Sequence, residues 1–159
     1  RREVMRKQRR LWEAGKVDYH IVDHGAAVHD VMTVFLTMFS ESMEDKANFM
    51  TAQMELFFRS LADTMAEAGL LRIGILELDT LPTAIVMCFD YHDCVYLYNN
   101  SYNPRYHALS VGLLSKVLCI KGSIQRDRKR FDFLKGREPY KYHLGGKEIP
   151  LYDCQIIIK

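Results

Sequence analysis

Apolar residues recur along the chain with two different periods, and the change between them divides the sequence into its expected elements. Between residues 28 and 39 they fall three and four positions apart, which predicts an amphipathic helix. A second stripe of this kind follows Thr51, whose hydroxyl is placed to cap the helix, and stops at Gly69. From residue 71 to residue 100 the apolar residues form short runs separated by turn residues. Two helices are therefore expected to precede an antiparallel meander.

Further segments complete the expected order. Residues 17–22 alternate apolar and polar side chains, as a strand does. Ser110 is placed to cap an apolar helix, and short strands are expected at 131–134 and 151–158. The helix is then a crossover, which places the strand at 131–134 parallel to the last strand of the meander. A splay between these two strands would open a slot beside the helix N-terminus, suited to a long ligand with a pyrophosphate.

Basic residues are concentrated in two segments, although the net charge of the whole chain is only +2. Residues 1–16 contain seven cationic and two acidic residues, and residues 121–141 contain eight and three. Two basic segments on an otherwise acidic domain favour an anionic ligand, with two solvated faces as the alternative. The sequence has no nucleic-acid-binding motif, so no nucleic-acid partner is expected.

The first basic segment is predicted to form a helix over residues 1–14 that ends at Gly15. The sequence lacks an initiating Met and opens inside this helix. We therefore interpret residues 1–15 as a solvated basic helix left from a preceding segment. Residues 16–159 then form a single domain, the C-terminal portion of a longer protein.

The composition, 48% hydrophobic and 26% charged residues, is that of an ordinary globular protein. No apolar run approaches the ~20 residues of a membrane helix, and no signal-peptide pattern is present, so a cytoplasmic protein without membrane insertion is expected. The four cysteines lack C-x-x-C spacing, which favours free buried thiols, with a Cys88–Cys94 contact across a hairpin as the alternative. His20 and His24 are four positions apart, but their segment is expected to be extended and not helical, so the helical spacing of metal ligands does not apply and no metal site is predicted.

A charged motif surrounds the exit of the strand at 131–134. It consists of Phe131-Asp132-Phe133-Leu134-Lys135-Gly136-Arg137-Glu138-Pro139-Tyr140-Lys141. Gly136 breaks the strand and Pro139 fixes a second bend. Ligands of open α/β sheets tend to sit beyond the carboxyl ends of strands, which favours a site here. Taken alone, however, the motif is more typical of an edge strand followed by a solvated charged turn.

This motif, together with the meander at 71–91, the segment 98–106 and Ser110-Val111-Gly112-Leu113-Leu114, resembles a known family. The segments are similar to GNAT-fold acetyltransferases of the bacterial cellulose-biosynthesis (CelD/BcsL) type, cousins of the Fem-type aminoacyl transferases. The resemblance implies an α/β (α+β) GNAT acyl-CoA N-acyltransferase fold, with a mixed central sheet and helices on both faces. It also implies that this chain corresponds to the C-terminal half of a two-half protein, whose missing N-terminal half is a partner.

In that fold, acyl-CoA lies in the splay between two parallel strands, and its pyrophosphate meets backbone N–H groups at the following helix. By position, the resemblance assigns the pantetheine strand to Tyr98, Asn99, Asn100 and Ser101. It assigns the phosphate turn to Leu109, Ser110, Val111, Gly112, Leu113 and Leu114. This turn departs from the usual glycine-rich signature, because Gly112 is its only glycine.

Acyl transfer from a thioester needs a base for the attacking acceptor, a donor for the oxyanion and an acid for the leaving thiolate. The candidate base is Asp132, acting directly or through water, and the candidate acid is Tyr140. Lys141 would fix an anionic substrate or the phosphates of the donor. Each has a structural alternative: a strand-end hydrogen-bond acceptor for Asp132, a packed ring for Tyr140 and a surface cation for Lys141.

The expected function is transfer of an acyl group, in particular acetyl from acetyl-CoA, to an amine or hydroxyl of a sugar, polysaccharide precursor or small molecule. No metal is expected to take part. One alternative is a Fem-like aminoacyl transferase, which the atypical phosphate turn favours. The other is an inactive GNAT-like scaffold in envelope-polysaccharide biosynthesis.

Overall fold

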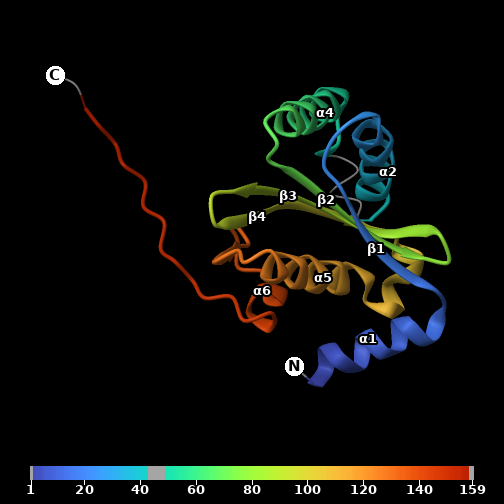
Figure 1. The fold of residues 1–159 in the computed structure, drawn as a ribbon. Helices are drawn as coiled ribbons and strands as arrows, with labels where there is room; N and C mark the ends of the chain where they lie inside the picture. Colours follow the sequence, from blue (N-terminus) through green and yellow to red (C-terminus); the bar gives the residue numbers. More distant parts are fainter. Residues whose placement is uncertain (1, 43–48, 158–159) are drawn as a thin grey trace.

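A five-stranded mixed sheet forms the centre of the computed structural model, which describes residues 2–42 and 49–157 (Figure 1). The strands follow one another across the sheet in chain order: β1 (Val17–Val22), β2 (Leu71–Leu78), β3 (Leu81–Tyr91), β4 (Cys94–Tyr102) and β5 (Arg130–Asp132). The first four pair antiparallel, and β5 runs parallel to β4. The meander and the parallel strand after the crossover are thus confirmed.

Helices cover both faces of this sheet. They are α1 (Arg2–Ala14), α2 (Ala26–Ser42), α4 (Ala52–Glu67), the 3-10 helix η1 (Pro104–Leu109), α5 (Val111–Gln125) and α6 (Pro139–His143). Helices α2 and α4 lie on one face, and α5, α6 and α1 lie on the other (Figure 1). The expected α/β (α+β) architecture, a mixed sheet with helices on both faces, is therefore confirmed.

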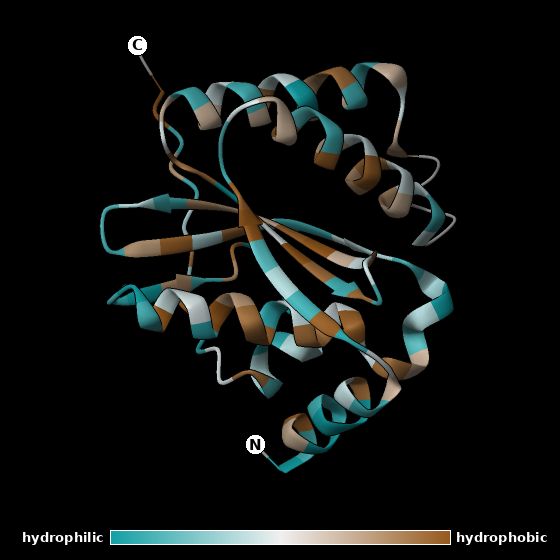
Figure 2. Cartoon of the chain, turned by 45° about the vertical axis from the view of Figure 1, so that its right-hand side comes forward, coloured by the Kyte–Doolittle hydropathy of each residue, from teal (hydrophilic) through white to brown (hydrophobic). Residues whose placement is uncertain are grey.

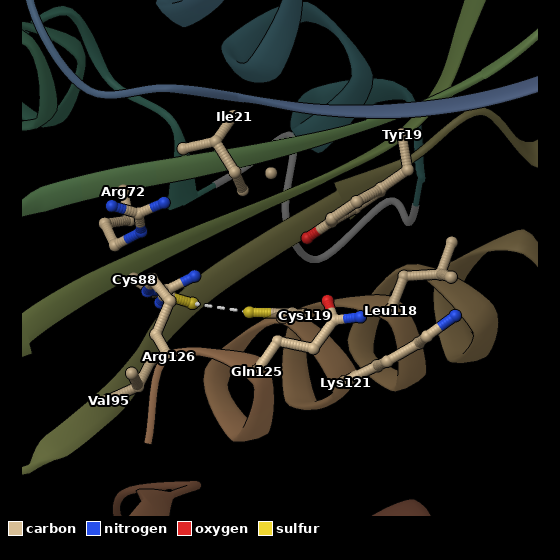
Figure 3. A pocket seen from close by; sticks show the side chains of 12 residues that line it. Tyr19, Ile21, Arg72, Cys88, Val95, Leu118, Cys119, Lys121, Gln125 and Arg126 are labelled. Atoms are coloured by element: carbon tan, nitrogen blue, oxygen red, sulfur yellow. Dashed lines mark hydrogen bonds between the residues drawn. The ribbon is translucent and has the colours of Figure 1, made fainter. Parts of the chain in front are cut away.

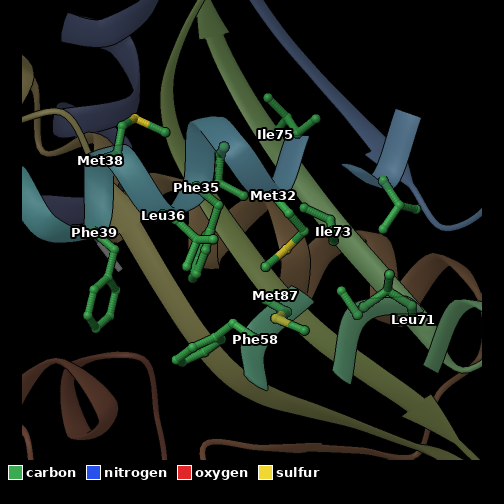
Figure 4. Packing of buried hydrophobic residues seen from close by; sticks show 13 residues of the cluster. Met32, Phe35, Leu36, Met38, Phe39, Phe58, Leu71, Ile73, Ile75 and Met87 are labelled. Atoms are coloured by element: carbon green, nitrogen blue, oxygen red, sulfur yellow. The ribbon is translucent and has the colours of Figure 1, made fainter. Parts of the chain in front are cut away.

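The α2/α4 face is packed with hydrocarbon, as the helical stripes predict (Figure 4). Phe35 is fully buried, and its ring centroid lies 6.0 Å from that of Phe39 and 6.2 Å from that of Phe58. Thr51 caps α4 as expected, because its Oγ1 accepts a hydrogen bond of 3.2 Å from the Met54 N–H.

On the other face, α1 packs beside α5 and contributes Leu11 to the core. Leu11 is fully buried in a cluster that includes Leu76, Val111 and Leu114. Most other residues of α1 are hydrophilic (Figure 2). Together with the partly buried Val4, Leu11 attaches this otherwise polar helix to the domain, so the helix is not solvated on all sides as expected.

Two local expectations fail. Residues 151–157 form no strand, because the segment leaves the body of the protein and has no neighbouring strand to pair with (Figure 1); residue 158 lies outside the described residues. Strand β5 ends at Asp132 because Leu134 has a left-handed backbone, with φ 57°.

All four cysteines are free, and three of them are buried. Cys88 and Cys94 do not face each other, because Cys88 pairs with Leu97 and Cys94 with Tyr91 in the β3–β4 register. Within the described part of the chain, no helix is both long enough and apolar enough to cross a membrane.

Candidate functional site

The parallel pairing between strands β4 and β5 ends after three residue pairs. Cys94, Val95 and Tyr96 pair with β5, and the last of these pairs is Tyr96 with Asp132. Strand β4 continues to Tyr102, whereas β5 ends at Asp132. The second half of β4 therefore has β3 on one side and no ladder to β5 on the other. This is the splay that the order of elements predicts.

A β-bulge lies at the start of the open part of β4. Met87 pairs with Asn99 and Cys88 with Leu97, which leaves Tyr98 as the extra residue. A bulge interrupts the ladder and redirects backbone groups. At the next amide, the Asn100 N–H donates to the Asn99 side-chain Oδ1 at 2.7 Å.

The side chains of the predicted pantetheine strand have different surroundings. The Tyr98 ring packs into the α2/α4 core, 4.9 Å from Phe89 and 6.1 Å from Phe58 between centroids. Ser101 is fully buried, and its hydroxyl has no hydrogen-bond partner among the described residues. Asn99 and Asn100 are half-buried. What Tyr98 offers a ligand at the splay is thus its backbone and not its ring.

The N-terminus of α5 follows directly from β4 through η1. Ser110 occupies the N-cap position in a left-handed conformation, φ 57°, but its hydroxyl makes no capping hydrogen bond, contrary to expectation. Its carbonyl instead accepts hydrogen bonds from the N–H groups of Leu113 and Leu114, both 3.0 Å. The N–H groups of the first turn, at Val111 and Gly112, precede the intrahelical ladder and point out of the helix end, as anion binding requires.

Side-chain packing fixes this helix end in place. Val111 and Leu114 are buried in the cluster that holds Leu11, with Leu109 packed at its edge. A Cβ on Gly112 would lie 3.1 Å from the Tyr102 ring, so glycine allows the end of β4 to approach the start of α5 closely. The predicted phosphate turn therefore presents backbone, and its apolar side chains serve the core.

The charged motif forms a tight loop between β5 and α6. Asp132 is exposed, and its Oδ1 accepts a hydrogen bond of 2.7 Å from the Leu134 N–H. The Lys141 side chain folds back onto the same loop, where its ammonium donates to the carbonyls of Leu134, Lys135 and Gly136 at 3.3, 3.0 and 3.3 Å. It also pairs with Glu138 at 2.8 Å. These contacts favour a structural role for Lys141, which the sequence did not predict.

Tyr140 lies on the α5 side of the sheet, against Phe133, with ring centroids 6.2 Å apart. The Lys116 ammonium sits 4.8 Å above the Tyr140 ring and donates a 2.7 Å hydrogen bond to the Gly112 carbonyl. Burial, and then the Glu138 charge, raise the pKa of Tyr140 to about 12. The phenol is therefore protonated at neutral pH and able to donate a proton.

Lys116 was missed by the sequence analysis, although it carried a signal. It is the only charged residue between Val111 and Ile120, and it is buried. A buried cation in an apolar helix costs free energy unless hydrogen bonds or a charge partner compensate for its lost hydration. Lys116 links the first turn of α5 to Tyr140, and so connects the predicted phosphate turn with the predicted acid.

One group of described residues has the donor atoms of a metal site. The ligand atoms of Asp18, His20 and Glu77 lie within 4.8 Å of one another on β1 and β2. These strands are at the opposite edge of the sheet from the splay. Grouped polar side chains of this kind are common on exposed strands, and the splay chemistry does not use them.

Comparison with known proteins agrees with this geometry. Residues 1–142 match the family described as the acetyltransferase (GNAT) domain. The chain therefore belongs to this family of acetyltransferase enzymes. No curated protein sequence matches it.

Solved structures with the same fold are GNAT acetyltransferases of low sequence identity. A GCN5-related N-acetyltransferase from Ralstonia eutropha has a TM-score of 0.64 at 15% identity, over 89% of this chain and 99% of that one. A ribosomal-protein-alanine N-acetyltransferase from Brucella melitensis has 0.56 at 10%, over 91% and 100%. AAC(6')-Iy, in complex with a bisubstrate analog of CoA, has 0.58 at 11%, over 89% and 100%. At these identities the likeness establishes the fold.

Proposed function

We propose that this domain transfers an acetyl group from acetyl-CoA, bound in the β4–β5 splay, to an amine or hydroxyl of a saccharide or amino-sugar acceptor. The observation that carries the proposal is the junction of an open strand edge with the N-terminus of α5. A long donor with amides at one end and a pyrophosphate at the other matches the strand edge and the helix end in their spatial order. The open edge of β4 offers backbone groups to the pantetheine amides, and the first turn of α5 offers N–H groups to the phosphates.

The bulge supplies the oxyanion donor in this mechanism. The Asn100 N–H is already directed to an oxygen acceptor, the Asn99 side chain, at 2.7 Å. The thioester carbonyl oxygen takes the place of that acceptor when the donor binds, and the N–H then stabilises the negative charge that develops on this oxygen. Asn99 keeps the amide satisfied in the empty protein and so avoids an unpaired backbone group at the open edge.

Asp132 and Tyr140 carry out the two proton transfers of the reaction. Asp132, exposed at the point where β5 leaves β4, accepts the proton of the attacking acceptor through water. Tyr140 donates a proton to the leaving thiolate, since its raised pKa keeps the phenol protonated at neutral pH. Lys116 stabilises the phenolate that results, because its ammonium already lies over the ring. Lys141 acts indirectly, because it holds the loop between Asp132 and Tyr140 in one conformation.

Two observations favour a saccharide or amino-sugar acceptor. The motif at 131–141 resembles the cellulose-biosynthesis type, which favours a polysaccharide precursor. Among proteins of similar fold, the bisubstrate analog of AAC(6')-Iy carries acetylneamine, and another is an aminoglycoside acetyltransferase in complex with sisomicin. An amino sugar is therefore the first acceptor to test.

Calorimetric titration of acetyl-CoA into paired Ser110 variants tests the donor site. Ser110→Asp and Ser110→Asn both tolerate the left-handed conformation and both suit an N-cap position. Only the aspartate places a negative charge where the pyrophosphate is expected. We expect Ser110→Asp to weaken acetyl-CoA binding about tenfold relative to Ser110→Asn, without loss of stability.

Equal affinity of the two variants for acetyl-CoA would indicate that the phosphates of the donor do not bind at the N-terminus of α5. Absence of binding by any thioester, to a chain whose thermal unfolding is cooperative, would overturn the proposal. It would favour the aminoacyl-donor or scaffold alternative instead.

A further inference from the structure

A cavity of about 400 Å³ lies between α5 and the β1–β3 part of the sheet (Figure 3). It is lined by the C-terminal half of α5, whereas the proposed phosphate site is at the N-terminal end of that helix. Lys121 and Gln125 line it and are exposed, so the cavity reaches solvent. Gly74 forms part of the opposite wall, where a Cβ would collide with the Tyr19 hydroxyl. The proposed acetyl transfer makes no use of this cavity.

Two thiols from different elements meet at the wall of the cavity. Cys88 is on β3 and Cys119 is on α5, and their sulfur atoms are 3.6 Å apart (Figure 3). Both residues are buried. The other cysteines have different surroundings: Cys94 directs its thiol toward the Val95 carbonyl, and Cys154 is exposed on the C-terminal segment. The Cys88–Cys119 pair is thus distinct from both.

Cations surround this pair. Arg72 and Arg126 line the same cavity, and the Tyr19 hydroxyl points toward the two sulfur atoms (Figure 3). The hydrogen bond with Cys88, followed by the Tyr19 hydroxyl and the Arg126 and Arg72 charges, lowers the pKa of Cys119. The same hydrogen bond and burial raise the pKa of Cys88. Cys119 is also the more accessible thiol, 8% exposed against 1% for Cys88, which favours Cys119 as the thiol that reacts first.

We propose that Cys119 and Cys88 form a peroxide-reactive dithiol site that closes to an intramolecular disulfide between α5 and β3. The Cys119 thiolate attacks one oxygen of a hydroperoxide, the O–O bond breaks, and the Cys119 sulfur becomes a sulfenic acid as the other oxygen leaves and is protonated. Cys88 then attacks the Cys119 sulfur, and a S–S bond forms as the S–O bond breaks and water departs with the Cys88 proton. The two thiols are oxidised by two electrons in total, and the peroxide is reduced.

Access and geometry support this order of events. A hydroperoxide is small enough to enter the cavity, and Cys119 lines it directly. A separation of 3.6 Å requires the sulfur atoms to approach by about 1.5 Å to reach the disulfide bond length. Cys88 and Cys119 are 31 residues apart, so the bond would close a long loop and anchor α5 to the sheet.

The test uses a Cys94→Ser/Cys154→Ser chain, in which only the proposed pair remains. After treatment with hydrogen peroxide, we expect both thiols to disappear from a thiol titration, with the intact mass lower by two hydrogens. The Tm should rise by about 6–12 °C and return on addition of dithiothreitol. With Cys88→Ser added, the reaction should stop at a sulfenic acid on Cys119, which dimedone captures.

A matched control retains a single buried thiol elsewhere in the sheet. The Cys88→Ser/Cys119→Ser/Cys154→Ser chain keeps Cys94 alone, and this thiol should survive the same peroxide dose. Survival of both thiols in the first chain, or their loss at the rate of Cys94, would overturn the proposal.

Peptide mapping of the unaltered chain removes any dependence on how the variants fold. Trypsin leaves Cys88 in residues 73–105 and Cys119 in residues 117–121. The expected product joins these two peptides, with fragment ions that place the link on Cys88 and not on Cys94. A link at Cys94, or no link between the peptides, would contradict the proposed pairing.

Discussion

The two faces of the sheet are filled in different ways. The α2/α4 face is hydrocarbon, with residues such as Met32, Phe35 and Met87 buried completely or nearly so. The α5 face also buries two lysines, Lys116 and Lys141, and the thiol pair beside its cavity. Both faces belong to the same strands: along β3, Met87 faces α2 and α4, and its neighbour Cys88 faces α5. The two buried lysines come from α5 and α6, whereas the thiol pair has one member on α5 and one on β3.

This contrast indicates where stability and where chemistry are located. Apolar burial contributes in proportion to area and needs no particular partner. A buried ammonium costs free energy unless hydrogen bonds compensate for its lost hydration. Lys116 and Lys141 both have such bonds, and both contact the segments that form the proposed site. The α2/α4 face thus supports the fold, and the α5 face holds the reacting groups in place.

The largest expected effect is on the hydrocarbon face. Phe35→Ala should lower the free energy of unfolding by about 3–5 kcal/mol, because it leaves a cavity among Phe39, Phe58 and Met32. Urea denaturation measures this loss. Phe57→Ala, on the adjacent helix but about half exposed, is the control and should change the free energy by less than about 0.5 kcal/mol.

Measuring the acetyl-CoA affinity of Phe35→Ala tests whether the α2/α4 face and the α5 face are independent of each other. The folded fraction of Phe35→Ala should bind the donor as the unaltered chain does, since the splay edge and the α5 end lie outside the cluster that holds Phe35. A large loss of affinity in Phe35→Ala would show that the two faces are not separate.

The next effect is kinetic and lies on the α5 face. Tyr140→Phe should reduce kcat about 100-fold, because the leaving thiolate loses its acid, with little change in stability or in acetyl-CoA affinity. Tyr142→Phe is the matched control on the same helix, since its hydroxyl contacts only Glu148 among the described residues. Steady-state kinetics with an amino-sugar acceptor measures both. Unchanged kcat in Tyr140→Phe would remove Tyr140 from the mechanism.

A smaller effect is expected where a buried cation supports the loop. Lys141→Met should cost about 2 kcal/mol of unfolding free energy, because three carbonyls lose a charged donor and Glu138 loses its partner. Lys135→Met, in the same loop with an exposed side chain, is the control. If Lys141 instead bound substrate, its variant would raise KM and leave stability unchanged, and thermal unfolding beside kinetics distinguishes these outcomes.

The arrangement of elements could be predicted from the sequence because periodicity is a local property. The stripe at 28–39 and the short runs after residue 71 each determine an element without knowledge of the rest. The crossover helix then predicts that β5 lies beside β4 and parallel to it, and the observed register confirms this pairing. The strand expected at 151–158 shows the limit, because an apolar pattern makes a strand only where a partner edge is present.

The site was predictable at the level of segments and not of contacts. The bulge at Tyr98 depends on the register between two strands, which no single strand encodes. The Cys88–Cys119 contact joins elements 31 residues apart and has no spacing signal. Lys141 was expected to face a substrate, but the turn at Gly136 brings three carbonyls within reach of its ammonium. Lys116 was within reach of sequence analysis, as a lone charge in an apolar run.

The smallest expected effect is the pH dependence of the Lys141–Glu138 pair. The hydrogen bond from Lys141 lowers the pKa of Glu138 below its ordinary value of 4.5. A carboxyl whose pKa falls on folding stabilises the folded state above its unfolded pKa, and this contribution disappears as the pH falls through the folded pKa. Because Glu138 is about half exposed, solvent screening limits the contribution to about 0.5 kcal/mol or less.

Glu138→Gln therefore should have slightly lower stability than the unaltered chain at pH 7 and equal stability once the pH is well below 4. In the Lys141→Met background the same substitution should have no pH-dependent effect, since the interaction that lowers the pKa is gone. Urea denaturation of the four chains at pH 7 and at pH 3 forms a double-mutant cycle that isolates the pair. A coupling that does not decrease between pH 7 and pH 3 would mean that Glu138 acts through packing and not through its charge, and the loop would then depend on Lys141 and its three carbonyls alone.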